Sequence, residues 1–77
     1  MKETFVIFAD EQYIGLASKL PLVEKVLRNE FRHKIVSFDG LSQTEEDENC
    51  YTAELKTTTN LDGFNYIQIK VCRETYE

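Results

Sequence analysis

Glycine, proline, cysteine and histidine are scarce in this chain of 77 residues, and tryptophan is absent. With three glycines and one proline, the chain has no flexible linker and no low-complexity tract. The longest apolar run, Phe5 to Ala9, is far shorter than the ~20 residues of a transmembrane helix. It is also shorter than a signal-peptide core of ~7–15 residues. The two cysteines are too few for a disulfide framework, so we expect a cytoplasmic protein that does not contact membranes.

The composition otherwise predicts an ordinary small folded domain. Hydrophobic residues make up 42% of the chain and aromatic residues 12%, which excludes wholesale disorder. The length fits a single domain spanning residues 1–77 and leaves no room for two. A chain of this size buries only ~60–65% of the surface that it exposes when unfolded, so we expect a small core.

The charges are divided between two neighbouring segments. The formal net charge is −5. Residues 19–34 contain five cations and only two acids, whereas residues 35–55 contain six acids and neither lysine nor arginine. A net negative chain disfavours general affinity for nucleic acid, because binding to phosphates requires cations at the contact. The basic segment keeps a local nucleic-acid contact open.

Hydrophobic patterns predict the first strands and one helix. Phe5 to Phe8 form a run of strand-forming residues, which predicts a strand. Residues 13–20 fit a strand or a short helix, and we favour the strand because Gly15 would cost ~1 kcal/mol inside a helix. Residues 21–34 predict a helix, since Leu22, Val23, Val26, Leu27 and Phe31 form one apolar stripe.

Three further strands are predicted after the helix. Residues 35–38 form the first of them, and residues 41–49 read as an exposed loop because they lack an apolar period. Residues 51–56 and 67–72 each alternate apolar and polar side chains, as half-buried strands do. The predicted element order is therefore β-β-α-β-β-β, with one helix packed on a largely antiparallel sheet in a two-layer α+β fold.

The alternation of apolar and polar side chains predicts how the last two strands pair. A three-residue loop, Leu61-Asp62-Gly63, would place Leu55 opposite Ile69 and leave every apolar side chain on one face. Thr52 would then face Cys72, so Cys50 would lie on a diagonal, beyond comfortable disulfide reach at ~7–8 Å between Cα atoms. We therefore expect both cysteines to be free thiols. We also expect Phe8, Leu27, Leu55 and Ile69 to form part of the core.

The sequence contains no recognisable catalytic arrangement, so we expect a protein that is not an enzyme. His33 lies between two cations, which disfavour proton uptake by the imidazole. Cys50 follows a run of acids, which disfavours the thiolate that a nucleophile needs. The acids lack the spacing of a calcium loop, and one histidine with two distant cysteines cannot complete a zinc site. We expect neither a metal nor another cofactor.

Two charged surfaces are the candidate binding sites. The first is the acidic run Glu45, Glu46, Asp47 and Glu48 with the neighbouring Tyr51, which would engage a basic protein groove. The second is the basic helix surface formed by Lys25, Arg28, Arg32 and Lys34, which would contact phosphates or an acidic partner.

The leading hypothesis is a small acidic protein-interaction module. It would regulate or inhibit a nucleic-acid-handling protein, as small accessory proteins of phages and mobile elements do. One alternative is direct nucleic-acid binding through the helix at residues 21–34. Another is a homodimeric structural subunit that pairs through the uncovered face of its sheet.

Overall fold

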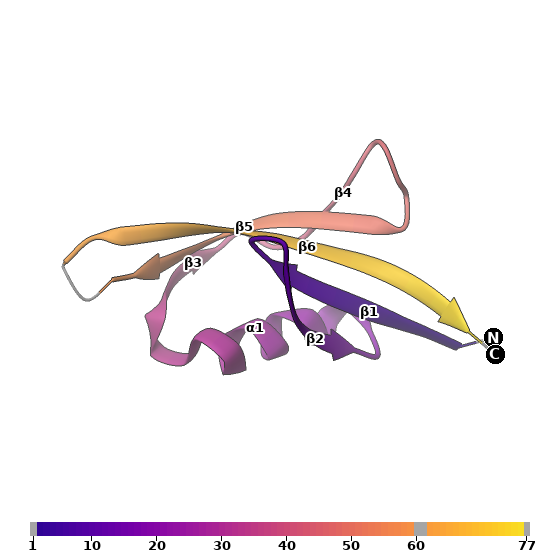
Figure 1. The fold of residues 1–77 in the computed structure, drawn as a ribbon, viewed down its shortest axis with the longest axis horizontal. Helices are drawn as coiled ribbons and strands as arrows, with labels where there is room; N and C mark the ends of the chain where they lie inside the picture. Colours follow the sequence, from indigo (N-terminus) through magenta and orange to yellow (C-terminus); the bar gives the residue numbers. More distant parts are fainter. Residues whose placement is uncertain (1, 60–61, 77) are drawn as a thin grey trace.

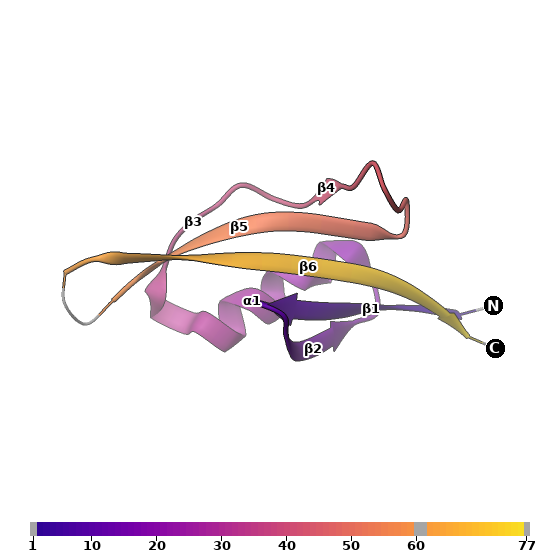
Figure 2. The same ribbon diagram turned by 45° about the horizontal axis from the view of Figure 1, so that its top comes forward.

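The fold is an antiparallel sheet that curls over one helical segment (Figures 1 and 2). A computed structural model describes residues 2–59 and 62–76, with the backbone alone at residue 33. The strands follow the order β2-β1-β6-β5-β3, and the short β4 pairs with β5. The strands are β1 (Lys2–Ala9), β2 (Gln12–Ala17), β3 (Ile35–Phe38), β4 (Ser42–Gln43), β5 (Cys50–Thr58) and β6 (Phe64–Tyr76).

The predicted α+β class and the β-β-α-β-β-β order are confirmed, with one strand added. β4 lies inside the segment predicted to be a loop, where Ser42 pairs with Thr52 and Gln43 with Tyr51. Two polar residues are too few to show an alternating pattern, so the sequence does not predict this strand. The ambiguous segment 13–20 forms β2 as far as Ala17, as favoured, but its last residue, Leu20, begins the first 3-10 turn.

The helical segment begins and ends with 3-10 turns. The turns η1 (Leu20–Leu22) and η2 (Arg32–Lys34) flank the α-helix α1 (Val23–Phe31). Pro21 lies in the first turn, where its missing N–H group leaves no hydrogen bond unmade. Arg32 has a φ of 44°, which takes the backbone out of the α-helical path and ends α1.

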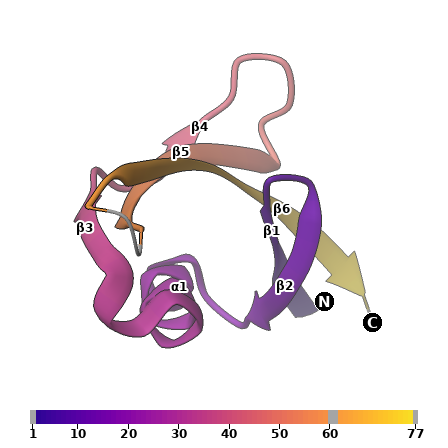
Figure 3. The same cartoon turned by 60° about the vertical axis from the view of Figure 1, so that its left-hand side comes forward.

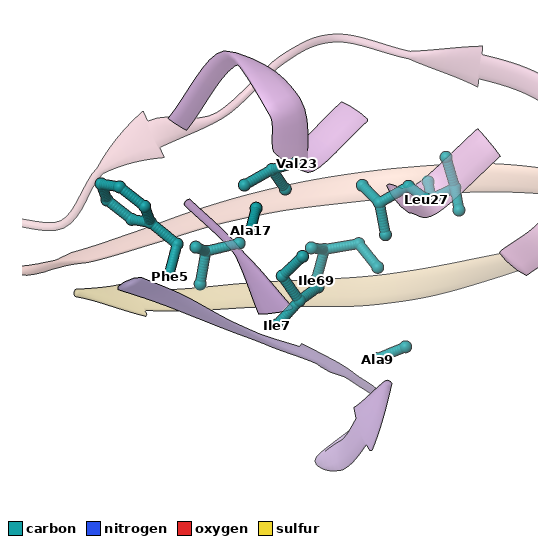
Figure 4. Packing of buried hydrophobic residues seen from close by; sticks show 9 residues of the cluster. Phe5, Ile7, Ala9, Ala17, Val23, Leu27 and Ile69 are labelled. Atoms are coloured by element: carbon teal, nitrogen blue, oxygen red, sulfur yellow. The ribbon is translucent and has the colours of Figure 1, made fainter. Parts of the chain in front are cut away.

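The core lies between α1 and the concave face of the sheet, as Figures 3 and 4 show. Leu27, Leu55 and Ile69 are almost completely buried there, which confirms three of the four predicted core residues. The prediction for Phe8 is wrong, because its side chain is only half-buried and lies on the convex face. Every residue from Phe5 to Phe8 is apolar, so the sequence pattern does not reveal which face of this strand meets the helix.

Gly15 allows the helix to approach β2 closely. A Cβ atom at this position would lie 3.2 Å from Cγ1 of Val26, which is tighter than ordinary van der Waals contact. The neighbouring Ala17 is buried against the same layer. The small side chains of β2 therefore determine how near the helix lies to this edge of the sheet.

The pairing of β5 with β6 differs from the predicted register by two residues. Leu55 lies opposite Ile67 rather than Ile69, and Ala53 lies opposite Ile69. The hairpin is closed by the Thr59 N–H group, which donates to the Gly63 carbonyl at 3.0 Å. Leu61, in the predicted turn, lies outside the described residues, and the left-handed φ of 59° belongs to Asp62. A register shift of two residues keeps every side chain on the same face of the sheet, so the alternation of apolar and polar residues is compatible with both registers.

The corrected register places the two cysteines directly opposite each other. Cys50 pairs with Cys72, and their sulfur atoms are 3.0 Å apart. Both are free thiols, as expected. The reason given for that expectation is wrong, because the two residues are not diagonal neighbours.

Candidate functional site

The convex side of the sheet, called the outer face here, carries side chains that α1 does not cover. Figure 3 shows α1 beneath the concave side and the β4–β5 loop on the other side. The outer face exposes apolar rings and branches, notably Tyr13 at 59% and Leu16 at 53% of their full accessible surface. Phe8 packs edge-on against Tyr13, with ring centroids 6.4 Å apart. An exposed apolar patch of this kind is typical of an interaction surface.

A shallow depression of about 780 Å³ lies next to this patch. Val6 and Phe8 form the apolar part of its lining, and Cys72 lines it as well. The polar residues that line it are Asp10, Glu11, Thr52, Gln68, Lys70 and Glu74. Three carboxylates and one ammonium group therefore border an apolar floor.

The β1–β2 turn holds two of these acids in position. Asp10 and Glu11 both have positive φ angles, 48° and 71°. The Asp10 N–H group donates to the Gln68 carbonyl at 2.9 Å, and Asp10 Oδ1 accepts from the Gln68 N–H group at 3.0 Å. Gln68 Nε2 also donates to Glu54 Oε2 at 3.0 Å. These bonds bring acids from two distant parts of the chain, the β1–β2 turn and β5, onto one face.

The predicted acidic run lies in the β4–β5 loop, which projects away from α1 (Figures 1 and 3). Its four acids are all exposed, but Asp47 differs from the three glutamates in its contacts. Asp47 Oδ1 accepts from the Asn49 N–H group at 2.9 Å, and Oδ2 accepts from the Cys50 thiol at 3.5 Å. The Thr44 hydroxyl donates to the Asp47 carbonyl at 2.7 Å. Asp47 thus shapes the loop, while Glu45, Glu46 and Glu48 carry its exposed charge.

Tyr51 does not join the acids of the loop. Its side chain lies on the concave side, where its ring is 6.5 Å from that of Phe5 in an edge-on arrangement. The Arg73 Nη2 group donates to the Tyr51 hydroxyl at 3.0 Å. Arg73 also lies over the Phe5 ring and forms an ion pair with Glu3 at 3.5 Å. In this structure Tyr51 packs against the core.

The predicted basic surface lies on the helical segment, on the other side of the molecule from the acidic loop (Figure 1). Lys25, Arg28, Arg32 and Lys34 are all exposed. Arg28 Nη2 lies 3.3 Å from Glu24 Oε1, one helical turn earlier. The structure therefore separates the two charge signs in space, as the sequence separates them along the chain.

Cys50 remains protonated at neutral pH. The hydrogen bond that it shares with Cys72 raises the pKa of Cys50 to about 12, and burial and Asp47 act in the same direction. Because the folded-state pKa is above the unfolded value, this thiol stabilises the fold below pH ~9 and loses that contribution as the pH rises toward 12. The neutral thiol is a poor nucleophile.

Residues 2–59 and 62–76 include no group of three or more metal-ligating side chains close enough to hold an ion. No described helix is long and apolar enough to span a membrane. Comparison with known protein families, curated proteins and solved structures finds no match to this chain.

Proposed function

We propose that this protein is a non-catalytic interaction module that binds a basic surface of a protein partner through its outer face. The observation that carries the proposal is the placement of an apolar patch beside a concentration of acids, on the side opposite the helix cations. Protein interfaces combine an apolar centre with a polar rim, and this face offers both. Its charge favours a cationic partner through complementary potentials.

The chemistry of the partner follows from the charge of this face. The acids Asp10, Glu11, Glu54 and Glu74 join the loop glutamates there, against the cations Lys2, Lys56 and Lys70. A surface of this sign repels phosphates and attracts lysine- and arginine-rich grooves. Such grooves are typical of proteins that handle nucleic acid, so we propose a regulator or inhibitor of a protein of that class.

Retention of partners by tagged variants tests this proposal. The test variant is E45Q/E46Q, which removes two charges from the loop and leaves Asp47 to shape it. The matched control is E24Q/E30Q, which removes two charges from the exposed side of α1. Each protein is presented to extract from its native cells, with and without nuclease treatment.

We expect a protein retained by the wild type and by E24Q/E30Q to be released from E45Q/E46Q at lower salt. Equal retention by all three proteins would contradict the role of the acids. Retention that is abolished by nuclease would instead support nucleic-acid binding through residues 21–34. If light scattering shows that the purified protein is a dimer, and if the outer face is buried in that dimer, the homodimeric alternative would be supported.

A further inference from the structure

We propose that Cys50 and Cys72 form a redox modification site, at which oxidation creates a reversible intramolecular disulfide between β5 and β6. The proposal rests on the pairing of the strands and on the environment of the two sulfur atoms. It does not depend on the identity of any binding partner.

The backbone already holds the two cysteines at bridging distance. The Arg73 N–H group donates to the Asn49 carbonyl at 2.7 Å, so residues 49 and 73 form a hydrogen-bonded pair. The next pair, Cys50 with Cys72, is therefore of the non-hydrogen-bonded kind, in which Cα atoms are ~4.5 Å apart. Disulfides span Cα separations of ~4.4–6.8 Å, so the bridge needs little movement of either strand.

The side chains point toward each other on the outer face. Their sulfur atoms are 3.0 Å apart and share a hydrogen bond. Cys50 exposes only 8% of its full accessible surface. Cys72 is half-buried and lines the depression together with Lys70 and Glu74. An oxidant that enters the depression therefore meets the Cys72 sulfur first.

Hydrogen peroxide is a sufficient oxidant for forming this disulfide. The Cys72 thiolate attacks one oxygen of hydrogen peroxide, the O–O bond breaks, and a sulfenic acid and hydroxide form. The hydrogen bond between the two thiols, which is the main cause of the raised Cys50 pKa, is lost once Cys72 is a sulfenic acid. The Cys50 thiol then attacks the Cys72 sulfur, the S–O bond breaks, and the thiol proton leaves with the hydroxyl group as water. Two thiols and one peroxide give one disulfide and two waters, with two electrons passed to the peroxide. A thiol such as glutathione reverses the reaction by exchange and is itself oxidised to its disulfide.

Oxidation would alter the base of the acidic loop. The disulfide removes the thiol proton that Cys50 donates to Asp47 Oδ2. It also joins positions 22 residues apart in the chain, which restricts the unfolded state. The oxidised protein should therefore melt at a temperature higher by at least about 5 °C.

Intact-mass measurement on the folded protein tests the proposal, with hydrogen peroxide as the probe. The matched variant is C50S/T52C, which moves one thiol to the diagonal position relative to Cys72. Under the predicted but incorrect register, Thr52 would face Cys72. A sample unfolded in denaturant shows that the oxidant can close the bridge in either protein.

We expect the folded wild type to lose about two mass units, as a monomer, at a rate at least tenfold above that of C50S/T52C. Addition of glutathione should restore the original mass. Folded wild type that forms only singly oxidised or intermolecular species would overturn the proposal. So would faster closure in C50S/T52C, or a lower melting temperature after oxidation.

Discussion

Replacing Leu27 with alanine is expected to lower the free energy of unfolding by about 2–5 kcal/mol. Leu27 is fully buried on the face of α1 that meets the sheet, and its side chain packs in the cluster shown in Figure 4. Truncation removes apolar contacts and leaves a cavity that a small core fills only in part. A chain of this length has a total stability of roughly 4–12 kcal/mol, so the variant should lose a large share of it.

Urea denaturation followed by circular dichroism measures this effect. The control variant Leu22→Ala removes the same side chain from a position that is 41% exposed, and its cost should be below about 1 kcal/mol. Leu27→Met keeps most of the buried volume and should cost less than about 1.5 kcal/mol. Equal midpoints for Leu27→Ala and Leu22→Ala would show that α1 packs on the sheet through another face.

Neutralising Glu45 and Glu46 is expected to slow association with the partner by roughly threefold to tenfold at low ionic strength. Both carboxylates are exposed at the end of a projecting loop, where their field reaches an approaching molecule before contact. Complementary charge acts mainly on the association rate and only weakly on dissociation. The loop itself should keep its conformation, because the variant E45Q/E46Q leaves the Asp47 hydrogen bonds intact.

Salt dependence separates this effect from a change in fold. The screening length falls from about 30 Å at 0.01 M salt to about 3 Å at 1 M, so the difference between wild type and E45Q/E46Q should vanish at high salt. Stopped-flow or surface-based kinetics with the purified partner give both rates. E24Q/E30Q removes the same charge from the other side of the molecule, farther from the contact, and should slow association much less than E45Q/E46Q does. A rate for E45Q/E46Q equal to that of the wild type at low salt would move attention to Lys25, Arg28 and Arg32.

Periodic patterns predicted the elements of this fold well, because burial on one face leaves a trace in the sequence. The apolar stripe that contains Leu27 identified the helix, and alternation around Leu55 and Ile69 identified the long hairpin. The same alternation has a period of two, so it defined the face of each strand but left the register open by two residues. That is why Cys50 was assigned a diagonal position rather than one opposite Cys72.

The composition of the candidate site was only partly predictable. The four acids of the loop, residues 45–48, form a contiguous run and were visible in the sequence. Asp10, Glu54 and Glu74 lie far apart along the chain, and only the pairing of β1, β5 and β6 brings them to one face. Tyr51 is next to the loop in sequence, but strand alternation turns its ring to the opposite face.

A map of the contact surface in the bound state shows most directly whether the outer face binds the partner. Backbone and methyl chemical shifts of the labelled protein are compared before and after addition of the purified partner. We expect the largest changes at the β1–β2 turn, at Leu16, at residues 44–48 and at the outer-face positions of β6. Changes confined to α1 and η2, with the outer face unaffected, would show that the partner does not bind the outer face.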